Sequence, residues 1–360
     1  MFLNFKNKKI SAIVSILPEN ESYFDDEIEN YNFPVKNSLK LKKLMGFKKH
    51  RIVKNEVCAT DLAIKGFRQL FEDKIIKKED IDAIIYVTQS PNHFGPQSSV
   101  IMLKELDFPE DMITYDLSQG CAGFVQGLFQ AFWLLNSHEI KKVAIITTDV
   151  LSRKLNKRDR SSYPLVGDGA AITIVENNND SSSDNHIYAY NKTIASGAMV
   201  INIPAGGFRM PSTEKTAIEK ICEDGNIRSL DNSVMDGASV FSFMQERVPQ
   251  MVYELLDYAN LTKKDIDSYM FHQPNKFMLE TLADTLKISY QKMPNNVVEN
   301  FGNSSSATIP INICYNLKNI ITKKPQKVFF AGFGIGLTLS GIIMDLPIIP
   351  YLKMIDYKED

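Results

Sequence analysis

The segment Lys77-Lys-Glu-Asp-Ile-Asp-Ala-Ile-Ile-Tyr-Val87 sets the architecture, because it recurs as Lys263-Lys-Asp-Ile-Asp-Ser-Tyr-Met-Phe271. In both copies a charged turn leads into a short apolar run, the pattern of a turn that opens a buried strand. Asp82 and Asp267 hold the same place in the two copies and lie 185 residues apart (267 − 82). This self-similarity indicates an internal repeat.

A second match has the same spacing. Lys141–Thr148 recurs as Gln326–Phe333, again 185 residues on (327 − 142 for the paired lysines). Amphipathic helical runs precede the first pair of copies, at Thr60–Phe71 and Val248–Tyr258. Strands alternating with helices predict an α/β protein with parallel βαβ units, right-handed crossovers and mostly buried sheets. The alternative is chance similarity between two common βαβ pieces.

The repeat predicts two pseudo-symmetric halves. Residues 1–180 form the first half and 186–360 the second, joined by the polar, Asn/Ser-rich connector Asn177–Asn185. The 360 residues are 44% hydrophobic and 23% charged, which is the balance of a core-forming protein and not of a disordered one.

Charge and apolar patterning exclude several classes of protein. A net charge of −2 gives no basic footprint for nucleic acid. The apolar runs are shorter than the roughly 20 residues of a membrane span, and the N-terminus lacks the pattern of a secretory signal, so a cytoplasmic location is expected. Because Cys58, Cys121, Cys222 and Cys314 are scattered without CxxC pairing, neither a zinc site nor a disulfide framework is predicted.

The sharpest local signal is Tyr115-Asp-Leu-Ser-Gln-Gly-Cys-Ala-Gly-Phe124. An extended run ends at Gly120 and a helical pattern starts at Cys121. A thiol at a helix start feels the positive end of the helix dipole, which favours the thiolate and a nucleophilic role. Taken alone, Cys121 would be better explained as a small buried apolar residue.

Two other polar residues change this balance. His272 ends the apolar run Tyr269–Phe271, so it lies at the carboxyl end of a strand, where open α/β sheets form ligand crevices. Asn303 lies in a Gly/Ser-rich loop that opens another helix, and the 185-residue offset places Ser306 of this loop opposite Cys121. The two loops are therefore expected to face each other. Alone, His272 would be a core or capping histidine and Asn303 a turn residue.

The segments around Cys121, His272 and Asn303, in that order and spacing, resemble the Cys-His-Asn set of the β-ketoacyl-acyl-carrier-protein synthase III family of condensing enzymes. The likeness extends over nearly the whole chain. It includes Ile16–Glu19, Val166–Ala170, Met235–Gly237, the pair Val240–Phe241 and the Gly-rich turn Gly332–Thr338.

The resemblance implies a thiolase-like, five-layered αβαβα fold and a homodimer. It makes Cys121 the nucleophile that holds the acyl group, and His272 and Asn303 the hydrogen-bond donors to the malonyl thioester as it loses carbon dioxide. Backbone N–H groups of Cys121 and Ile335, in the active-site loop with Gly334, would bind the oxyanion, and Phe333 would shield the carboxylate. The resemblance implies no metal and no cofactor, with CoA or acyl-carrier-protein thioesters as substrates.

Substrate contacts are also implied, with departures from the family pattern. Arg160 matches a basic residue beside the CoA adenine, but the Trp and Arg-Thr-Gly of that clamp are missing from Lys40–Phe47. Lys276 would replace a carrier-docking Arg, and Phe241 belongs to the substrate-binding set. Gly95 or Phe94 is expected at the position that limits acyl length from the partner subunit, and Gly95 there would leave a more open pocket.

A lysine cluster offers a further contact. Lys40, Lys42, Lys43, Lys48 and Lys49 could attract an acidic carrier protein, or form a solvated charged helix face. The leading hypothesis is decarboxylating condensation of an acyl thioester with malonyl-acyl-carrier-protein, which initiates fatty-acid or related acyl-chain synthesis. One alternative is acyl transfer to a hydroxyl or amine of a specialised glycan or metabolite pathway. Another is a non-catalytic scaffold within a condensing complex.

Overall fold

The duplicated segments form the same hydrogen-bonded unit twice in the computed structural model. Asp82 N–H donates to Lys142 O (3.0 Å), and its carboxylate accepts from Lys142 N–H (2.9 Å). Asp267 repeats both bonds with Lys327, at 2.9 and 2.8 Å. The same bonds recur at the 185-residue spacing found in the sequence, which favours a structural repeat over chance similarity of the two segments.

The structure describes residues 1–178 and 185–358. Most of the predicted connector, 179–184, lies outside the described residues, and the proposed boundaries of the two halves stay a prediction. Among the described residues no helix combines the length and the apolar character that a membrane crossing requires.

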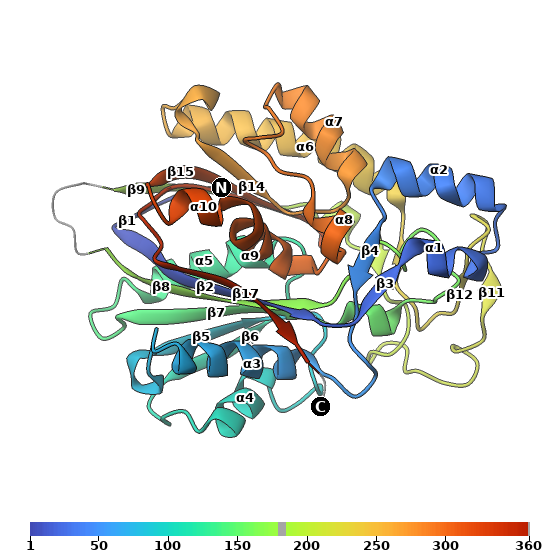
Figure 1. Cartoon of the computed structure of the whole chain (residues 1–360), viewed down its shortest axis with the longest axis horizontal. Coiled ribbons are helices and arrows are strands. Elements are labelled where there is room, and N and C mark those ends of the chain that lie inside the picture. Colours follow the sequence, from blue (N-terminus) through green and yellow to red (C-terminus); the bar gives the residue numbers. More distant parts are fainter. Residues whose placement is uncertain (179–184, 359–360) are drawn as a thin grey trace.

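Two sheets form the body of the molecule (Figure 1). In spatial order, the larger sheet contains β17 (Tyr351–Tyr357), β2 (Lys8–Pro18), β8 (Gly169–Asn177), β7 (Lys142–Asp149), β5 (Ala83–Val87) and β6 (Ile113–Leu117). The smaller sheet contains β1 (Phe2–Lys6), β9 (His186–Thr193), β16 (Thr338–Leu346), β15 (Gln326–Gly334) and β14 (Ser268–Phe271).

Helices cover both outer faces of this pair of sheets and fill the space between them. The helices α3 (Ala59–Glu72) and α4 (Ser98–Leu106) lie under the larger sheet, and α6 (Gly237–Tyr258) and α7 (Lys276–Leu286) lie over the smaller one. Between the sheets lie α5 (Gly123–Leu134), α9 (Thr308–Asn312), a π-helical turn (Ile313–Leu317) and α10 (Lys318–Ile321). The result is the expected αβαβα order of five layers.

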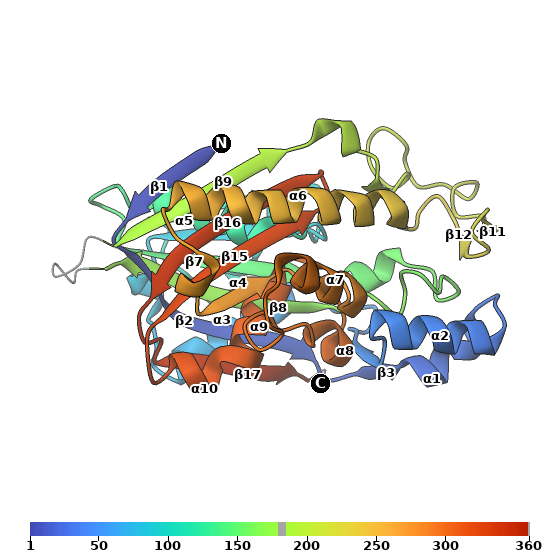
Figure 2. The same cartoon turned by 90° about the horizontal axis from the view of Figure 1, so that it is seen from above.

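Each sheet buries apolar side chains on both faces, which explains the continuous apolar runs in central strands such as β5 and β7. One core cluster lies between the sheets around α5, a second packs α6 and α7 on the smaller sheet, and a third packs α3 and α4 on the larger. Figure 2 shows α6 lying across β9, β16 and β15.

The strand directions correct one expectation. Strands β5, β6 and β7 are parallel, as are β14 and β15. However, β8 runs antiparallel to β7, and β16 antiparallel to β15, so both sheets are mixed. In each half, the strand that follows the second matched segment runs back beside it, β8 beside β7 and β16 beside β15. This return brings residues 150–168 and the turn after Gly334 to the same edge as the strand ends.

The ends of the chain exchange between the sheets. Strand β1 pairs with β9 of the smaller sheet, whereas β17 pairs with β2 of the larger one. The predicted helix Thr60–Phe71 is confirmed as α3. The predicted helix at Val248 begins earlier, at Gly237, because Asp236 caps it by accepting from Ala238 N–H and Ser239 N–H (both 3.1 Å).

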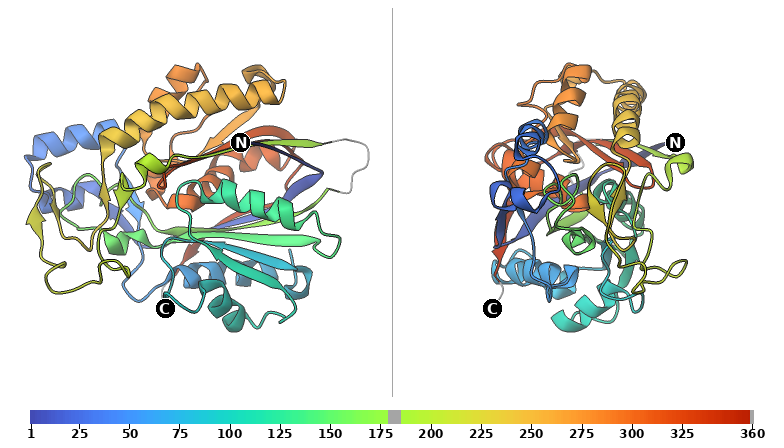
Figure 3. Two further views of the ribbon diagram at one scale, coloured as in Figure 1. Left: turned by 180° about the vertical axis from the view of Figure 1, so that it is seen from behind. Right: turned by 90° about the vertical axis from the view of Figure 1, so that its right-hand side faces the viewer.

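A smaller assembly lies beside the sheets (Figure 3). It is built from α1 (Phe24–Glu27), α2 (Val35–Met45), β3 (Glu21–Tyr23), β4 (Lys49–Arg51) and α8 (Val297–Phe301), with the short strands β10 (Ile201–Asn202), β11 (Lys220–Ile221), β12 (Ile227–Arg228) and β13 (Val234–Met235). These segments surround the sheet edge where β6, β7 and β14 end.

Candidate active site

Cys121 lies between the end of β6 and the start of α5. The strand ends at Leu117 and the helix begins at Gly123, so Cys121 precedes the first helical residue and is not itself helical. A turn causes this offset, because Gly123 N–H donates to Gly120 O at 2.6 Å. The expected strand–turn–helix placement holds, with the helix start shifted by this turn.

The sulfur of Cys121 is directed at two backbone N–H groups, its own and that of Ile335. Ile335 stands at the tip of the turn between β15 and β16, after Gly334, whose φ is 154°. A Cβ atom on Gly334 would lie 2.6 Å from the Cβ and 2.7 Å from the sulfur of Cys121. The turn can approach the thiol this closely only because Gly334 has no side chain.

Burial raises the pKa of the Cys121 thiol to about 11, although both N–H groups favour the thiolate. The expected lowering by the helix dipole is therefore wrong for the resting enzyme. The reason is that the sulfur is surrounded by protein, and the desolvation cost of a thiolate exceeds the gain from two N–H donors. The nearby Asp149 carboxylate also disfavours the thiolate.

Asn303 is held by its backbone on both sides. Its N–H donates to Leu165 O (2.8 Å), and its carbonyl oxygen accepts from Gly167 N–H (3.1 Å). Its Oδ1 accepts from Ser305 N–H at 2.9 Å, which identifies the other amide atom as Nδ2. Nδ2 has no partner among the described residues, so its two hydrogens are available to a ligand.

His272 directly follows β14, as predicted, and its N–H donates to Ala331 O at 2.8 Å. The side chain is 1% exposed. Burial lowers the pKa of His272 to about 3, opposed only in part by a hydrogen bond to the backbone of Ser305, so the imidazole is neutral at physiological pH. Its Nδ1 lies 2.7 Å from Thr308 Oγ1.

One cavity of about 270 Å³ brings two of the three predicted catalytic residues together, since Cys121 and Asn303 both line it, with Ser305 and Ile335. The expected facing of the two loops is confirmed. His272 is not among the lining residues. It hydrogen-bonds the backbone of Ser305, which lines the cavity, and its ring meets that of Phe333 edge to face at 5.7 Å. Phe333 is 3% exposed and packs in the core.

Two neighbouring cavities share wall residues with the Cys121 cavity. One of about 340 Å³ shares Leu165 and Met235 and is lined by Phe241, which stacks on Phe277 at 5.5 Å. The other, of about 830 Å³, is lined by Gly95, which has no atom within 4 Å of its would-be Cβ. Cys121 therefore lies between two hollows.

A further hollow of about 390 Å³ adjoins the 340 Å³ cavity, and Phe47 lines both. Lys276 lines this hollow with Lys42, Lys43 and Lys48, and its ammonium lies 3.5 Å from Glu299. Of the predicted lysine cluster, Lys42 and Lys49 are ion-paired, with Asp25 and Glu21 respectively.

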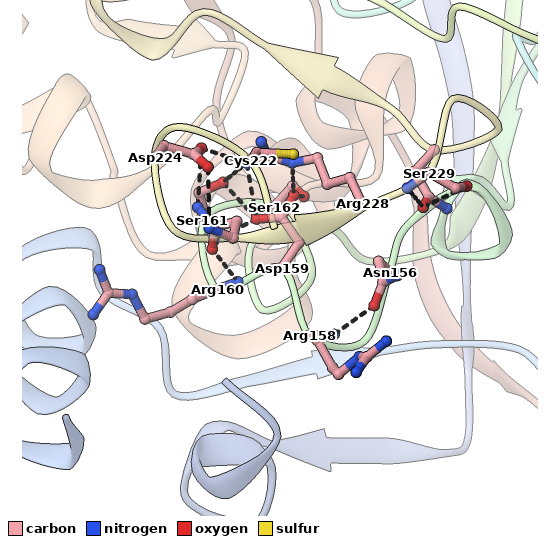
Figure 4. Close-up of polar contacts among 12 residues, drawn as sticks. Asn156, Arg158, Asp159, Arg160, Ser161, Ser162, Cys222, Asp224, Arg228 and Ser229 are labelled. Carbon is pink, nitrogen blue, oxygen red and sulfur yellow. Dashed lines mark hydrogen bonds and ion pairs between the residues drawn. The ribbon is translucent and has the colours of Figure 1, made fainter. Parts of the chain in front are cut away.

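Arg160 does not line the Cys121 cavity. Figure 4 shows its side chain extending from the loop that also carries Asp159, in the direction away from Arg228. Its guanidinium covers the ring of Phe33 at 3.5 Å, so an aromatic residue of the chain already occupies one face. The adjacent buried pair of Asp159 and Arg228 (2.5 Å) ties the loop of Arg160 to the β11–β12 hairpin. Arg160 therefore contacts Phe33 and does not form part of the cavity wall.

Sequence reasoning missed Thr308 and Asp149. Asp149 is fully buried at the end of β7 and accepts from Gln89 N–H (2.7 Å) and from the hydroxyls of Ser90 and Thr88. Burial raises its pKa to about 6. For Asp149, the sequence signal was an acidic residue at the end of the apolar run Lys142–Asp149, which indicates a carboxylate at the end of a buried strand. For Thr308 the signal was weaker, because hydroxyl residues are common throughout its loop.

Comparisons with known proteins agree with this geometry. The family model of 3-oxoacyl-[acyl-carrier-protein] synthase III matches residues 115–191, and that of its C-terminal part matches 256–346. The chain is 29% identical to a putative 3-oxoacyl-[acyl-carrier-protein] synthase 3 of Campylobacter jejuni, over 96% of both chains. It is 30% identical to the β-ketoacyl-[acyl-carrier-protein] synthase III of Lactobacillus helveticus, over 83% of this chain and 87% of that one.

A solved structure is similar throughout. The 3-oxoacyl-(acyl-carrier-protein) synthase of Burkholderia xenovorans superposes with a TM-score of 0.89 at 27% identity, covering 99% of each chain. Sequence likeness over most of both chains, the five layers and the cysteine turn point the same way. The chain belongs to the β-ketoacyl-[acyl-carrier-protein] synthase III family, whose members are thiolase-fold acyltransferases.

Proposed function

We propose that this enzyme condenses an acyl thioester with malonyl-acyl-carrier-protein, with loss of carbon dioxide, and that Cys121 carries the acyl group between the two half-reactions. One observation supports these roles above the others. The N–H groups of Cys121 and Ile335 converge on the sulfur of a cysteine that shares its cavity with Asn303. A carbonyl oxygen next to that sulfur would find two preorganised donors.

In the first half-reaction, the sulfur of Cys121 attacks the carbonyl carbon of the acyl thioester. A new S–C bond forms, the thioester bond of the donor breaks, and the thiol proton ends on the released CoA or carrier thiol. Negative charge gathers on the carbonyl oxygen in the transition state, where the two N–H groups stabilise it. Because burial raises the pKa of the resting thiol, Cys121 enters this step protonated, and its proton is lost as the S–C bond forms.

In the second half-reaction, the malonyl carboxylate leaves as carbon dioxide, and the electrons of the broken C–C bond move onto the thioester carbonyl as an enolate. Asn303 Nδ2 and the neutral imidazole of His272 are the donors to that oxygen. Neutral donors suit this step, because a positive charge would also stabilise the departing carboxylate. The enolate carbon then attacks the acyl carbon, the S–C bond to Cys121 breaks, and the leaving thiolate takes up one proton from solvent.

Family membership favours condensation over transfer to a hydroxyl or amine acceptor, and over a non-catalytic scaffold. The geometry adds a reason. An acyl transfer of that kind needs the oxyanion site at Cys121 but has no use for an unpaired Asn303 amide, which suits an enolate.

The lysine-lined hollow indicates the side from which the carrier delivers its substrates. Lys43, Lys48 and Lys276 surround it, and through Phe47 it adjoins the 340 Å³ cavity that leads to Cys121. Positive charge there suits the phosphate of a phosphopantetheine arm and an acidic carrier surface. The reaction uses these side chains and two thioester substrates, a primer linked to CoA or to the carrier and a malonyl group linked to the carrier.

We infer that the enzyme is a homodimer. Within the described residues, β6 is the outermost strand of the larger sheet and pairs on one side only, with β5. Ile113 at its start is 42% exposed. Pairing of two β6 strands across a two-fold axis would cover this edge. Light scattering after size exclusion would return twice the mass of the 40.8 kDa chain, and the single mass would contradict the inference.

The experiment for the proposed function combines purified enzyme, an acyl-CoA and malonyl-carrier. Release of carbon dioxide and a β-ketoacyl-carrier product are expected, together with an acyl adduct on Cys121 in intact-protein mass spectrometry. Cys121→Ala should lose both, and Cys314→Ala, which changes a buried cysteine outside the cavity, is the control. Undiminished product from Cys121→Ala would overturn the assignment.

A further inference from the structure

Lys154 stands where the Cys121 cavity meets the larger, 830 Å³ cavity. It ends the 3₁₀ turn Leu151–Lys154, which follows β7, and it lines both cavities, together with Gln89, Leu151 and Ile203. Any chain that extends from Cys121 toward the larger cavity must pass this residue. Lys154 is therefore placed where a side chain can discriminate between acyl groups.

The charges around the two cavities are one-sided. Neither is lined by an acidic residue among those the structure describes, and Lys154 is the only charged residue in the wall of the smaller one. The larger cavity also has Arg153 in its wall. That guanidinium is already engaged, since it donates to the backbone carbonyls of Asn55 and Val57.

The ammonium of Lys154 is unoccupied. It has no hydrogen-bond or ion-pair partner within the described parts of the chain, and it lies 3.5 Å from the position that a Cβ atom on Gly206 would take. Gly206 and Gly207 both line the larger cavity, and neither has a side chain that could cover the ammonium. A cation without a partner, in the wall of a hollow that no acidic residue among those described lines, can bind an anion that enters it.

The direction of the substrate follows from the order of the cavities. The lysine-lined hollow and the 340 Å³ cavity lie on one side of Cys121, linked to it through Leu165 and Met235. If the phosphopantetheine arm enters there, the acyl chain on the other side of the thioester carbonyl points toward Lys154. This step rests on the proposed function.

We propose that the primer of this enzyme is an acyl chain that ends in a carboxylate, and that Lys154 selects it by binding that carboxylate. The thioester end reacts at Cys121 while the far end meets the ammonium at the junction of the cavities. Lys154 is thus a specificity-determining residue. An uncharged chain of the same length would fit the same space and leave the ammonium without a partner.

The test compares chain-matched donors, glutaryl-CoA with pentanoyl-CoA and adipyl-CoA with hexanoyl-CoA. The measurement is the rate of acyl-Cys121 formation by intact-protein mass spectrometry, with Cys121→Ala as the background. The wild type should acylate about two to five times faster with the carboxylate-bearing member of at least one pair, the range for a solvent-accessible ion pair. Added salt should shrink this preference.

Variants locate the effect. Lys154→Met should lose the preference while keeping the rate with the uncharged donor, Lys154→Arg should retain it, and Lys154→Glu should reverse it. Lys157→Met changes a neighbouring exposed lysine outside both cavities and should leave the preference intact. Equal rates with both members of every pair, or an equal loss with both in Lys154→Met, would overturn the proposal.

The two proposals fail in different ways. Acylation and condensation with pentanoyl-CoA or hexanoyl-CoA but no gain from a carboxylate would refute the role of Lys154 and leave the condensing activity intact. No acyl-Cys121 with any of the donors, CoA-linked or carrier-linked, would count against the proposed function itself.

Discussion

The imidazole of His272 and the hydroxyl of Thr308 are joined by a hydrogen bond of 2.7 Å between Nδ1 and Oγ1. Thr308 Oγ1 also lies 2.9 Å from Ser305 O. Its single proton can serve only one of these acceptors at a time. When it goes to Nδ1, the neutral ring carries its own proton on Nε2 and can donate to an enolate. When it goes to Ser305 O, Nε2 is an acceptor.

Thr308→Val should therefore slow malonyl decarboxylation by about a hundredfold, the lower end of what positioned proton donors contribute. The change keeps the side-chain volume but removes the hydroxyl that can donate to Nδ1 and so favour the tautomer with its proton on Nε2. Thr308→Ser should restore most of the rate and the pH profile. Acyl-Cys121 formation, measured separately, should change much less. If it fell by the same factor, the role of Thr308 would be structural.

Gly334→Ala should reduce acyl-Cys121 formation by at least about tenfold, because the added Cβ would lie 2.6 Å from the Cβ of Cys121 at a φ of 154°, and strain of this kind costs roughly 1–3 kcal/mol. Gly207→Ala is the matched control, since nothing lies within 4 Å of its would-be Cβ. Circular dichroism checks that both variants fold. Normal acylation by Gly334→Ala would mean that this turn does not set the geometry at the sulfur.

The thiol of Cys121 should react slowly with iodoacetamide at neutral pH in the absence of substrate. With a pKa raised to about 11 by burial, the thiolate fraction grows about tenfold per pH unit well below that value. Alkylation followed by mass spectrometry between pH 7 and 9.5 should show this rise without a plateau. A plateau near pH 8 would indicate a thiolate activated at rest.

The buried pair of His50 and Glu27 (2.8 Å) should make stability depend on pH. Despite burial, hydrogen bonds and charge attraction between the two raise the pKa of His50 above 6.5 and lower that of Glu27 below 4.5. The His50 contribution is complete below pH 6.5 and is lost as pH rises through its folded pKa. The Glu27 contribution is present above pH 4.5 and is lost as pH falls.

Glu27→Gln should consequently cost about 3–5 kcal/mol near pH 5.5, the range for breaking a buried ion pair, and less at pH 9. Urea unfolding at the two pH values measures this difference. His50 also contacts Val166 O, whose residue bridges to Asn303, so the variant should lower activity as well. Equal destabilisation at both pH values would show that the pair is not charged.

Lys43→Glu should raise the KM for malonyl-carrier several-fold, roughly three to ten times at low salt, and leave kcat nearly unchanged. Lys43 lines the hollow at the entrance to the 340 Å³ cavity. Lys264→Glu, which reverses the charge of an exposed lysine that lines none of these cavities, is the control. An equal rise in KM for both variants would show that the effect comes from the net charge of the protein and not from the position of Lys43.

The sequence was sufficient for the repeat and for the residues at its strand ends. Asp82 and Asp267 could be matched because a local turn is encoded by adjacent residues, and both copies make the same backbone bonds. The neighbourhoods of Cys121 and Asn303 followed from the offset. The antiparallel return of β8 and β16 could not be read, since strand direction depends on which neighbour each strand pairs with.

What the sequence determined by itself, then, is the duplicated α/β architecture and the candidate site residues Cys121, His272 and Asn303, in loops after strands or before helices. Tertiary structure alone decided their chemical state. Burial makes Cys121 a thiol and His272 neutral, and Thr308, from another element, places its hydroxyl 2.7 Å from Nδ1 of the imidazole. It also placed Lys154 between two cavities. The physical reason is that periodicity and turns are local properties, whereas desolvation and the joining of cavities depend on segments far apart in the chain.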